Sequence, residues 1–221
     1  EMVKHATNAY LATSLSFIYD IADICKAVGA DVTDVAKALR SDYRIGYEAY
    51  LDASAGFSGG HLERDLDYLH KVAKLMGVGV PVLNAVIKKN TNRRKIVWDC
   101  LGNVKNKIVA FWGVTYKPGA PMSNNSLPAK LIRDMYKLGA DVTISDPSLK
   151  QTPYGAASGA KGIVCITPWK ELKKLNFKKV SKLMVAPKIL FDARNYFKDM
   201  EDKIKEAKDQ ADLVIVSFHF G

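Results

Sequence analysis

The chain has 221 residues, 48% of them hydrophobic, and a formal net charge of +10. This length suffices for one large domain or two small ones, each with its own core. It contains no run of about 18 apolar residues, so we expect no membrane span. The excess lysines spread over 88–107, 170–188 and 198–208 without a recognition motif. We therefore interpret them as surface charge and expect no nucleic-acid partner.

The three cysteines, Cys25, Cys100 and Cys165, each lie in an apolar stretch. Their number is odd and their spacing fits no metal site. This pattern favours reduced cysteines in the core of a cytoplasmic protein. We therefore predict no metal centre and no disulfide framework.

The first hundred residues have helical periodicity. Helices are predicted at 1–28, 31–39, 63–76 and 81–101, with a small-residue loop at 52–60. The first helix is expected to bury one apolar stripe, which consists of Ala6, Ala9, Tyr10, Ser14, Phe17, Ile18, Ile21, Ile24 and Cys25. Pro81 is a favourable first residue for the last helix. This half is predicted to be all-helical.

From residue 107 the pattern changes to buried strands that alternate with helices. Strands are predicted at 107–116, 141–147, 162–169, 188–194 and 213–218, with helices at 126–138 and 200–212. Such alternation indicates a parallel, doubly wound sheet. The predicted fold class is α/β, with an all-helical dimerisation domain at 1–104 followed by a Rossmann-like parallel α/β domain at 105–221.

The turn after the first strand, GVTYKPGAPMSNNS, lies where open α/β sheets bind phosphates. It is not G-x-G-x-x-G, and that dinucleotide fingerprint occurs nowhere in the chain. The sheet domain by itself therefore gives no reason to expect NAD.

Spaced motifs run through most of the chain. They are Glu1-x-x-Lys4-x-x-x-Asn8, Gly29-Ala30-Asp31-Val32, Arg44-Ile45-Gly46, Gly56-Phe57-Ser58-Gly59-Gly60 before Asp65, Gly113-Val114-Thr115-Tyr116-Lys117-Pro118, Asp146-Pro147, Thr167-Pro168-Trp169 and Asp192-Ala193-Arg194-Asn195. In this order they resemble the UDP-glucose/GDP-mannose dehydrogenase family over about residues 1–198. Each motif alone is weak, whereas eight in order are specific.

The resemblance implies the central helical and C-terminal nucleotide-sugar-binding domains of that family. Its NAD-binding domain would lie before Glu1. The family oxidises the C6 alcohol of a UDP- or GDP-sugar to a carboxylate, uses two NAD, and supplies polysaccharide biosynthesis. A homodimer formed through the helical domain is implied as well.

Lys4 and Asn8 are four residues apart, so both project from one helix face. The resemblance implies that they flank the C6 oxygen, where a cation and an amide stabilise an oxyanion. It implies that Asp65 orders a water and helps as general base. The alternative reading is an exposed lysine, an ordinary helix asparagine and a surface aspartate.

Five further residues take substrate-binding roles from the resemblance. They are Arg44, which would reach the neighbouring subunit's site, Phe57 and Gly59 in the small-residue loop, and Lys117 and Arg194 beside the nucleotide-sugar. Arginine suits paired contacts with phosphate or carboxylate. Surface cations at loops and strand ends are the alternative for the three basic residues.

Two departures from the family pattern affect the expected chemistry. The nucleophilic cysteine, which holds the aldehyde-level intermediate, falls on His61, and an imidazole is the weaker carbonyl nucleophile here. At 120–126 the family's acidic pair and arginine are replaced by Ala-Pro-Met-Ser-Asn-Asn-Ser. One hypothesis is an enzyme that retains the first oxidation; the other is a non-catalytic, dimeric nucleotide-sugar-binding module.

Overall fold

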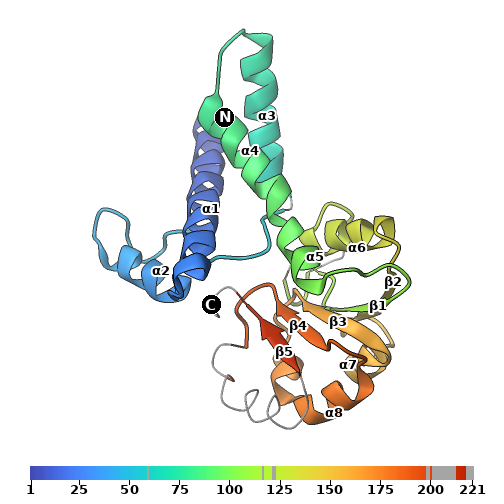
Figure 1. Cartoon of the computed structure of the whole chain (residues 1–221). Helices are drawn as coiled ribbons and strands as arrows, with labels where there is room; N and C mark the ends of the chain where they lie inside the picture. The colour runs from blue at the N-terminus through green and yellow to red at the C-terminus, as the bar shows by residue number, and fades with distance from the viewer. Residues whose placement is uncertain (59, 116, 121–122, 198–199, 201–212, 218–221) are drawn as a thin grey trace. The chain divides into compact units, whose positions relative to one another are not determined.

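A computed structural model describes residues 1–58, 60–115, 117–120, 123–197, 200 and 213–217. Contacts divide these residues into two compact units, one spanning Glu1–Arg94 and the other Lys95–Ser217. Figure 1 shows helices in the first unit and a sheet covered by helices in the second. The predicted tail helix at 200–212 lies almost wholly outside the described residues.

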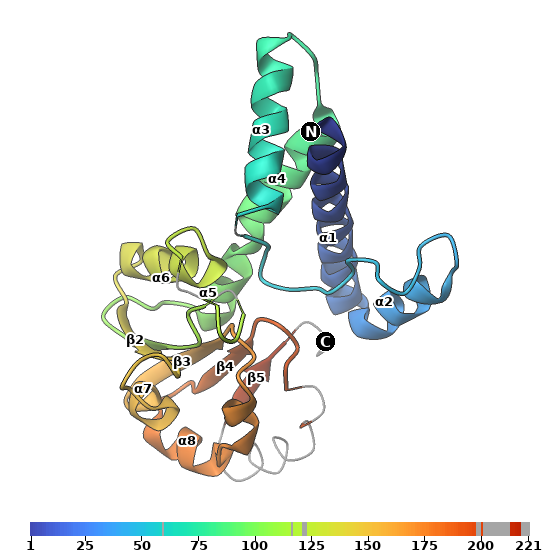
Figure 2. The same ribbon diagram turned by 180° about the vertical axis from the view of Figure 1, so that it is seen from behind.

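The first unit has four helices in its described part: α1 (Met2–Val28), α2 (Val32–Ser41), α3 (Leu62–Leu75) and α4 (Pro81–Arg93). Helix α1 ends at Gly29, whose φ of 74° is the left-handed conformation that glycine adopts without strain. The Asp31 side chain then caps α2 by accepting from the Thr33 amide. Helices α1, α3 and α4 pack side by side, with α2 near the C-terminal end of α1 (Figures 1 and 2).

Helix α1 has two apolar faces rather than the single buried stripe that its periodicity predicts. Ala9, Ile18 and Cys25 of that stripe are buried, together with Ala12, Ser16, Tyr19 and Ala22. Ala6 is exposed instead, and Tyr10, Phe17 and Ile24 are 71%, 49% and 58% exposed, so the prediction is wrong for these four residues. The covered residues of α1 are mostly small, whereas the large side chains of Tyr10, Phe17 and Ile24 remain at the surface.

The single helix predicted at 81–101 is two helices. Helix α4 ends at Arg93, and α5 (Lys95–Leu101) begins after Arg94, at the point where the two compact units meet in the sequence. Helix α5 packs on two strands of the second unit, so its apolar residues belong to a different core from those of α4.

The sheet of the second unit is parallel in every described pairing, in the order β2-β1-β3-β4-β5. Its strands are β1 (Ile108–Trp112), β2 (Asp141–Ser145), β3 (Ala160–Cys165), β4 (Ile189–Asp192) and β5 (Val214–Val216). The predicted α/β class with a parallel sheet is confirmed, and each predicted strand overlaps an observed one, although β3 begins two residues before the predicted 162–169.

Helices cover both faces of this sheet (Figure 1). Helix α5 and α6 (Leu127–Lys137) lie on one face, and α7 (Pro153–Ala157) and α8 (Phe177–Leu183) lie on the other, after the short 3-10 helix η1 (Lys170–Lys174). Alternate residues of a strand point to opposite faces, so β1 is buried on both sides. The periodicity missed α7 and α8 because each is too short to repeat an apolar pattern.

Within the described part of the chain, no helix is both long and apolar enough to cross a bilayer. Cys25 and Cys165 are buried and Cys100 is half-buried, and none of the three forms a disulfide bond.

The turn after β1 is packed tightly at Gly113. Its φ is 82°, and a Cβ there would lie 2.3 Å from Cβ and 2.9 Å from the backbone nitrogen of Thr167. Gly119, in the same loop, has a φ of 77° and nothing within 4 Å of its Cβ position. Both glycines therefore adopt a positive φ that disfavours other residues, but only Gly113 also lies against another residue, Thr167.

We predict that Gly113→Ala destabilises the chain by about 2 kcal/mol more than Gly119→Ala, because only the first change adds overpacking to backbone strain. Urea unfolding of both variants measures the difference. Equal losses of unfolding free energy in the two variants would show that Thr167 moves away from an added Cβ at position 113 without a measurable cost.

Candidate functional site

Helix α4 fixes the loop at 52–60 through buried polar side chains. Asn90 donates from Nδ2 to the Phe57 carbonyl at 2.9 Å and accepts the Phe57 amide at Oδ1 at 2.8 Å. Arg93, 4% exposed, donates from Nε to the Ser54 carbonyl at 2.9 Å. The predicted binding residue Phe57 is thus buried, and Asn90 holds its backbone through two hydrogen bonds.

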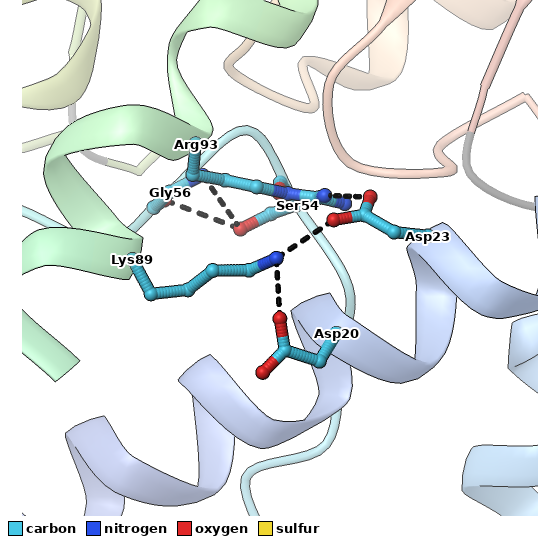
Figure 3. A network of polar contacts seen from close by, with 6 residues as sticks. All are labelled: Asp20, Asp23, Ser54, Gly56, Lys89 and Arg93. Atoms are coloured by element: carbon cyan, nitrogen blue, oxygen red, sulfur yellow. Dashed lines mark hydrogen bonds and ion pairs between the residues drawn. The ribbon is translucent and has the colours of Figure 1, made fainter. Parts of the chain in front are cut away.

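The same helix is tied to α1 by ion pairs (Figure 3). Lys89 Nζ lies 2.7 Å from Asp23 Oδ2 and 2.5 Å from Asp20 Oδ1, and Arg93 pairs with the other oxygen of Asp23. The Tyr19 hydroxyl lies 2.9 Å from Ser54 Oγ. These contacts hold α4 and the loop against α1.

Asn8 and Asp65, 57 positions apart, meet where α1 packs on α3. Asn8 donates from Nδ2 to Asp65 Oδ2 at 2.6 Å, and Arg64 donates from Nε to Asp65 Oδ1 at 3.0 Å. The Asp65 side chain is fully buried. The structure therefore joins two of the predicted site residues by a direct hydrogen bond.

These contacts stabilise the charged form of Asp65. The Asn8 hydrogen bond lowers its pKa most, burial opposes that effect, and Arg64 lowers it further, so that the pKa falls from 3.8 to about 2. Asp65 is therefore a carboxylate at any physiological pH.

His61 and Lys4 lie close to this pair along their helices. His61 precedes the first turn of α3, and its carbonyl accepts the Asp65 amide at 2.9 Å. Lys4 lies one helical turn before Asn8 on α1. Both side chains are exposed. The four predicted catalytic residues therefore come from the start of α1 and the start of α3.

Arg44 does not join this cluster within the chain. It follows α2, which lies near the C-terminal end of α1 (Figure 1), whereas Asn8 is in the second turn of α1. Its guanidinium pairs with Asp42 through Nη2 at 2.6 Å and Nε at 3.0 Å. The side chain is 73% exposed. Gly59, the remaining predicted binding residue of this unit, lies outside the described residues.

In the second unit the strand order places a switch point between β1 and β3. The chain goes from β1 to β2 on one side and then returns to β3 on the other. The loops after these two strands touch there, because Thr167 donates from Oγ1 to the Thr115 carbonyl at 2.6 Å. In open α/β sheets the carboxyl ends of the strands at such a switch point are where ligands bind.

Asp146, after β2, fixes both of these loops. Its Oδ2 accepts the Val114 amide at 3.0 Å and the Trp169 indole at 3.2 Å, and its Oδ1 accepts from Ser148. Burial raises the pKa of Asp146, but the hydrogen bonds from Ser148, Val114 and Trp169 outweigh it, so the pKa is lowered. The aspartate acts as a structural acceptor for the loops after β1 and β3.

Lys117 and Arg194 lie at this same carboxyl edge of the sheet. Lys117 belongs to the loop after β1, and Arg194 follows β4 by two residues. The Arg194 amide donates to Asp192 Oδ1 at 3.1 Å, which fixes its backbone, and both basic side chains are exposed. Two cations at the strand ends can bind an anionic ligand.

The described residues offer no replacement for the thiolate. Burial raises the pKa of the Cys165 thiol well above its usual value, with Asp192 adding to the effect. Cys25 is buried in α1 and Cys100 is in α5, neither of them in the loop before α3. Among the described residues no cluster of three or more His, Cys, Asp or Glu side chains is placed to hold a metal ion.

Comparison with known proteins identifies the family. Residues 1–92 match the model described as "UDP-glucose/GDP-mannose dehydrogenase family, central domain", and residues 110–199 match that family's "UDP binding domain". The chain belongs to the UDP-glucose/GDP-mannose dehydrogenase family.

Curated relatives include the UDP-glucose 6-dehydrogenase TuaD of Bacillus subtilis, 34% identical over 215 residues that cover 89% of this chain and 46% of that protein. The UDP-glucose 6-dehydrogenase of Pseudomonas aeruginosa is 29% identical over 221 residues, covering 89% of this chain and 48% of that protein. The chain thus spans about half the length of the curated relatives it matches.

Solved structures share the fold. A UDP-glucose dehydrogenase from Pyrobaculum islandicum has a TM-score of 0.79 at 21% identity, covering 100% of this chain and 51% of that one. A UDP-D-ManNAc dehydrogenase from Pyrococcus horikoshii has a TM-score of 0.75 at 22% identity, covering 89% of this chain and 48% of that one.

Sequence reasoning missed three residues of the first unit's site. Asn90 and Arg93 are buried polar residues on the face of α4 that carries Val86, at i+4 and i+7. Polar residues on an otherwise apolar helix face were the signal for them. His5 lies beside Asp65, with Nδ1 3.4 Å from Oδ2. Only the packing of α1 on α3 reveals that contact.

We predict that Asp65→Asn lowers the free energy of unfolding at pH 6. We expect the difference in unfolding free energy between the variant and the unaltered chain to be smaller at pH 3. A carboxylate with a lowered pKa stabilises the folded state above about pH 4 and loses that effect as the pH falls towards 2. Urea unfolding at both pH values measures it. Asp67→Asn, at an exposed position of α3, is the control, and a pH-independent Asp65→Asn loss would contradict the prediction.

Proposed function

We propose that this chain is the dimerisation and nucleotide-sugar-binding part of an NAD-dependent nucleotide-sugar 6-dehydrogenase that acts on the C6 alcohol of a UDP- or GDP-sugar. The hydrogen bond between Asn8 and Asp65 carries the proposal. Two residues with family roles, distant in sequence, meet at the start of helices that also carry Lys4 and His61. Lys117 and Arg194 at the strand ends support binding of the nucleotide's phosphates.

The described residues do not fit a nicotinamide dinucleotide themselves. A dinucleotide needs a tight glycine turn leading into a helix. Here α6 starts only at Leu127, after a long loop, and its first amides are capped by Ser126, whose side chain accepts the Ala129 amide. We therefore place NAD outside these 221 residues. The cytoplasm, where nucleotide-sugars and reduced thiols occur, is the proposed location.

His61 limits the proposed reaction. Oxidation of the alcohol to the aldehyde needs a proton acceptor and oxyanion support, which Asp65, Lys4 and Asn8 supply in the proposal. Further oxidation through a covalent adduct needs a nucleophile, and the described loop has none as strong as a thiolate. The proposed product of this site is therefore the aldehyde, with carboxylate formed slowly.

The alternative function is a non-catalytic dimer with a degenerate sugar site. The absence from 120–126 of the family's acidic pair and arginine favours it. The complete protein distinguishes the two: aldehyde formation from UDP-glucose and NAD supports the enzyme, and binding without turnover supports the module. Rapid formation of UDP-glucuronate would contradict the inference from His61.

The exposed face of α1 supports a homodimer. Val3, Tyr10, Phe17 and Ile24 are seven residues apart; Thr7, Ser14 and Ile21 fall between them and Val28 follows, so the steps alternate between four and three. This is the spacing of a helix that packs along another helix. Val3 and Val28 are 80% and 70% exposed at its two ends. We propose that a second copy of the chain covers this heptad stripe.

We predict that Lys117→Met and Arg194→Met each weaken UDP-sugar binding about 10-fold or more, because each removes a charge-assisted contact. Isothermal titration calorimetry of the 221-residue chain with UDP-glucose measures it. Lys137→Met, an exposed lysine at the other edge of the sheet, is the control. No binding by the unaltered chain at millimolar UDP or UDP-sugar would refute the sugar-binding proposal.

We predict that Phe17→Glu converts the dimer to monomer without unfolding the chain, because a charge placed at the centre of the heptad stripe must be desolvated on association. Sedimentation velocity gives the mass, and circular dichroism checks the helices. Lys26→Glu changes the charge at an exposed position of α1 off the stripe and is expected to remain dimeric. A monomeric unaltered chain would sink the dimer proposal.

A further inference from the structure

The loop at 51–58 keeps its shape through side chains rather than through backbone pairing. Between the described residues, no backbone group of this loop forms a hydrogen bond to another backbone group. Leu51 and residues 53–57 are nevertheless buried. A buried segment without backbone pairing has several conformations of similar free energy unless side chains stabilise one of them. The side chains that contact this loop therefore determine its conformation.

Asn90 does for Phe57 what a neighbouring strand would do. Its Oδ1 accepts the Phe57 amide at 2.8 Å and its Nδ2 donates to the Phe57 carbonyl at 2.9 Å, so both backbone groups of one loop residue are paired. Asn90 is 6% exposed, and loss of its side chain would leave two buried groups without a partner. The backbone orientation of Phe57 is therefore set by a residue of α4.

Ser54, three residues earlier, is held at its carbonyl and at its hydroxyl. Arg93 donates from Nε to the carbonyl at 2.9 Å, and the Tyr19 hydroxyl lies 2.9 Å from Oγ. The Arg93 guanidinium also lies 5.0 Å from the centre of the Tyr19 ring and pairs with Asp23 of α1 (Figure 3). Because Asp23 compensates this cation, Arg93 can remain buried where it contacts the loop.

The loop leads directly to the residues of the proposed chemistry. His61 follows it, and Asp65 lies in the first turn of α3. In the proposed function these residues act at C6 of the sugar, so the loop before them is expected to contact the sugar. The phosphates of the nucleotide are expected at Lys117 and Arg194 instead.

Resting on the proposed function and on the substrate-binding role expected of Phe57, we propose that Asn90 and Arg93 are positioning residues for sugar binding. Neither has to touch the ligand. They hold the loop in one conformation before the ligand arrives, so that binding does not have to order it. Ordering a flexible segment costs free energy on binding, and preorganisation removes that cost. The two residues therefore affect the sugar half of a nucleotide-sugar and not the nucleotide.

Isothermal titration calorimetry of the 221-residue chain with UDP-glucose and with UDP measures the contribution of the sugar as the ratio of the two affinities. We expect Asn90→Ala to lower this ratio about 10-fold, because UDP-glucose binds more weakly while the affinity for UDP stays within about 2-fold. Asn92→Ala, at an exposed position of the same helix, is the matched control and is expected to change neither affinity. A merely structural role of Asn90 would weaken both ligands alike or neither, and either result would overturn the proposal.

Arg93→Lys is a second, more conservative variant, which decides the matter if Asn90→Ala does not fold. It keeps a cation for Asp23 but lacks the Nε–H that reaches Ser54, so we expect the affinity ratio to fall about 3-fold or more while circular dichroism shows intact helices. An unchanged ratio in the folded variants would refute the positioning role and leave the proposed function intact. If the unaltered chain binds neither UDP nor UDP-glucose, the proposed function fails, and the positioning role fails with it.

Discussion

A fully buried carboxylate governs the helical unit. An uncompensated charge in such a position costs several kcal/mol, so Asp65 needs hydrogen-bond donors where α1 packs on α3. Asn8 supplies one from α1, and Arg64, the residue before Asp65 on α3, supplies the other. The same requirement determines what lies nearby, because Lys4, His5 and His61 all stand within about one helical turn of these residues. Folding and the candidate chemistry therefore depend on the same contact.

The sequence was most informative where one element repeats a pattern. The parallel sheet was predictable because five apolar segments alternate with helices, and the buried strand β1 matches that expectation. Periodicity could not say which side of α1 is covered, because both sides are apolar. Tyr10 and Phe17 are therefore exposed against expectation. The break between α4 and α5 could not be predicted either, because the helical pattern of the sequence continues through Arg94. What changes there is the packing, since α4 packs on α1 and α3 whereas α5 packs on the sheet.

The candidate site shows the same division. Asn8, Asp65 and His61 were predictable from motif spacing, because a family match assigns roles to positions without knowledge of packing. The contact of His5 with Asp65 was not predictable, since it depends on how α1 rotates against α3. Asn90 and Arg93 lay between these cases: their polarity on an apolar face was visible, but their partners in the loop were not.

Pairing of two copies along the heptad stripe of α1 would make sugar binding depend on the protein concentration. Two-fold pairing along α1 in antiparallel order would bring the segment after α2 of one copy towards Asn8 and Asp65 of the other. Arg44 lies far from Asn8 of its own chain. In such a pair it would instead complete the site that Asn8 and Asp65 form in the other copy. Such a site obeys mass action, so dilution alone would weaken sugar binding by dissociating the two copies.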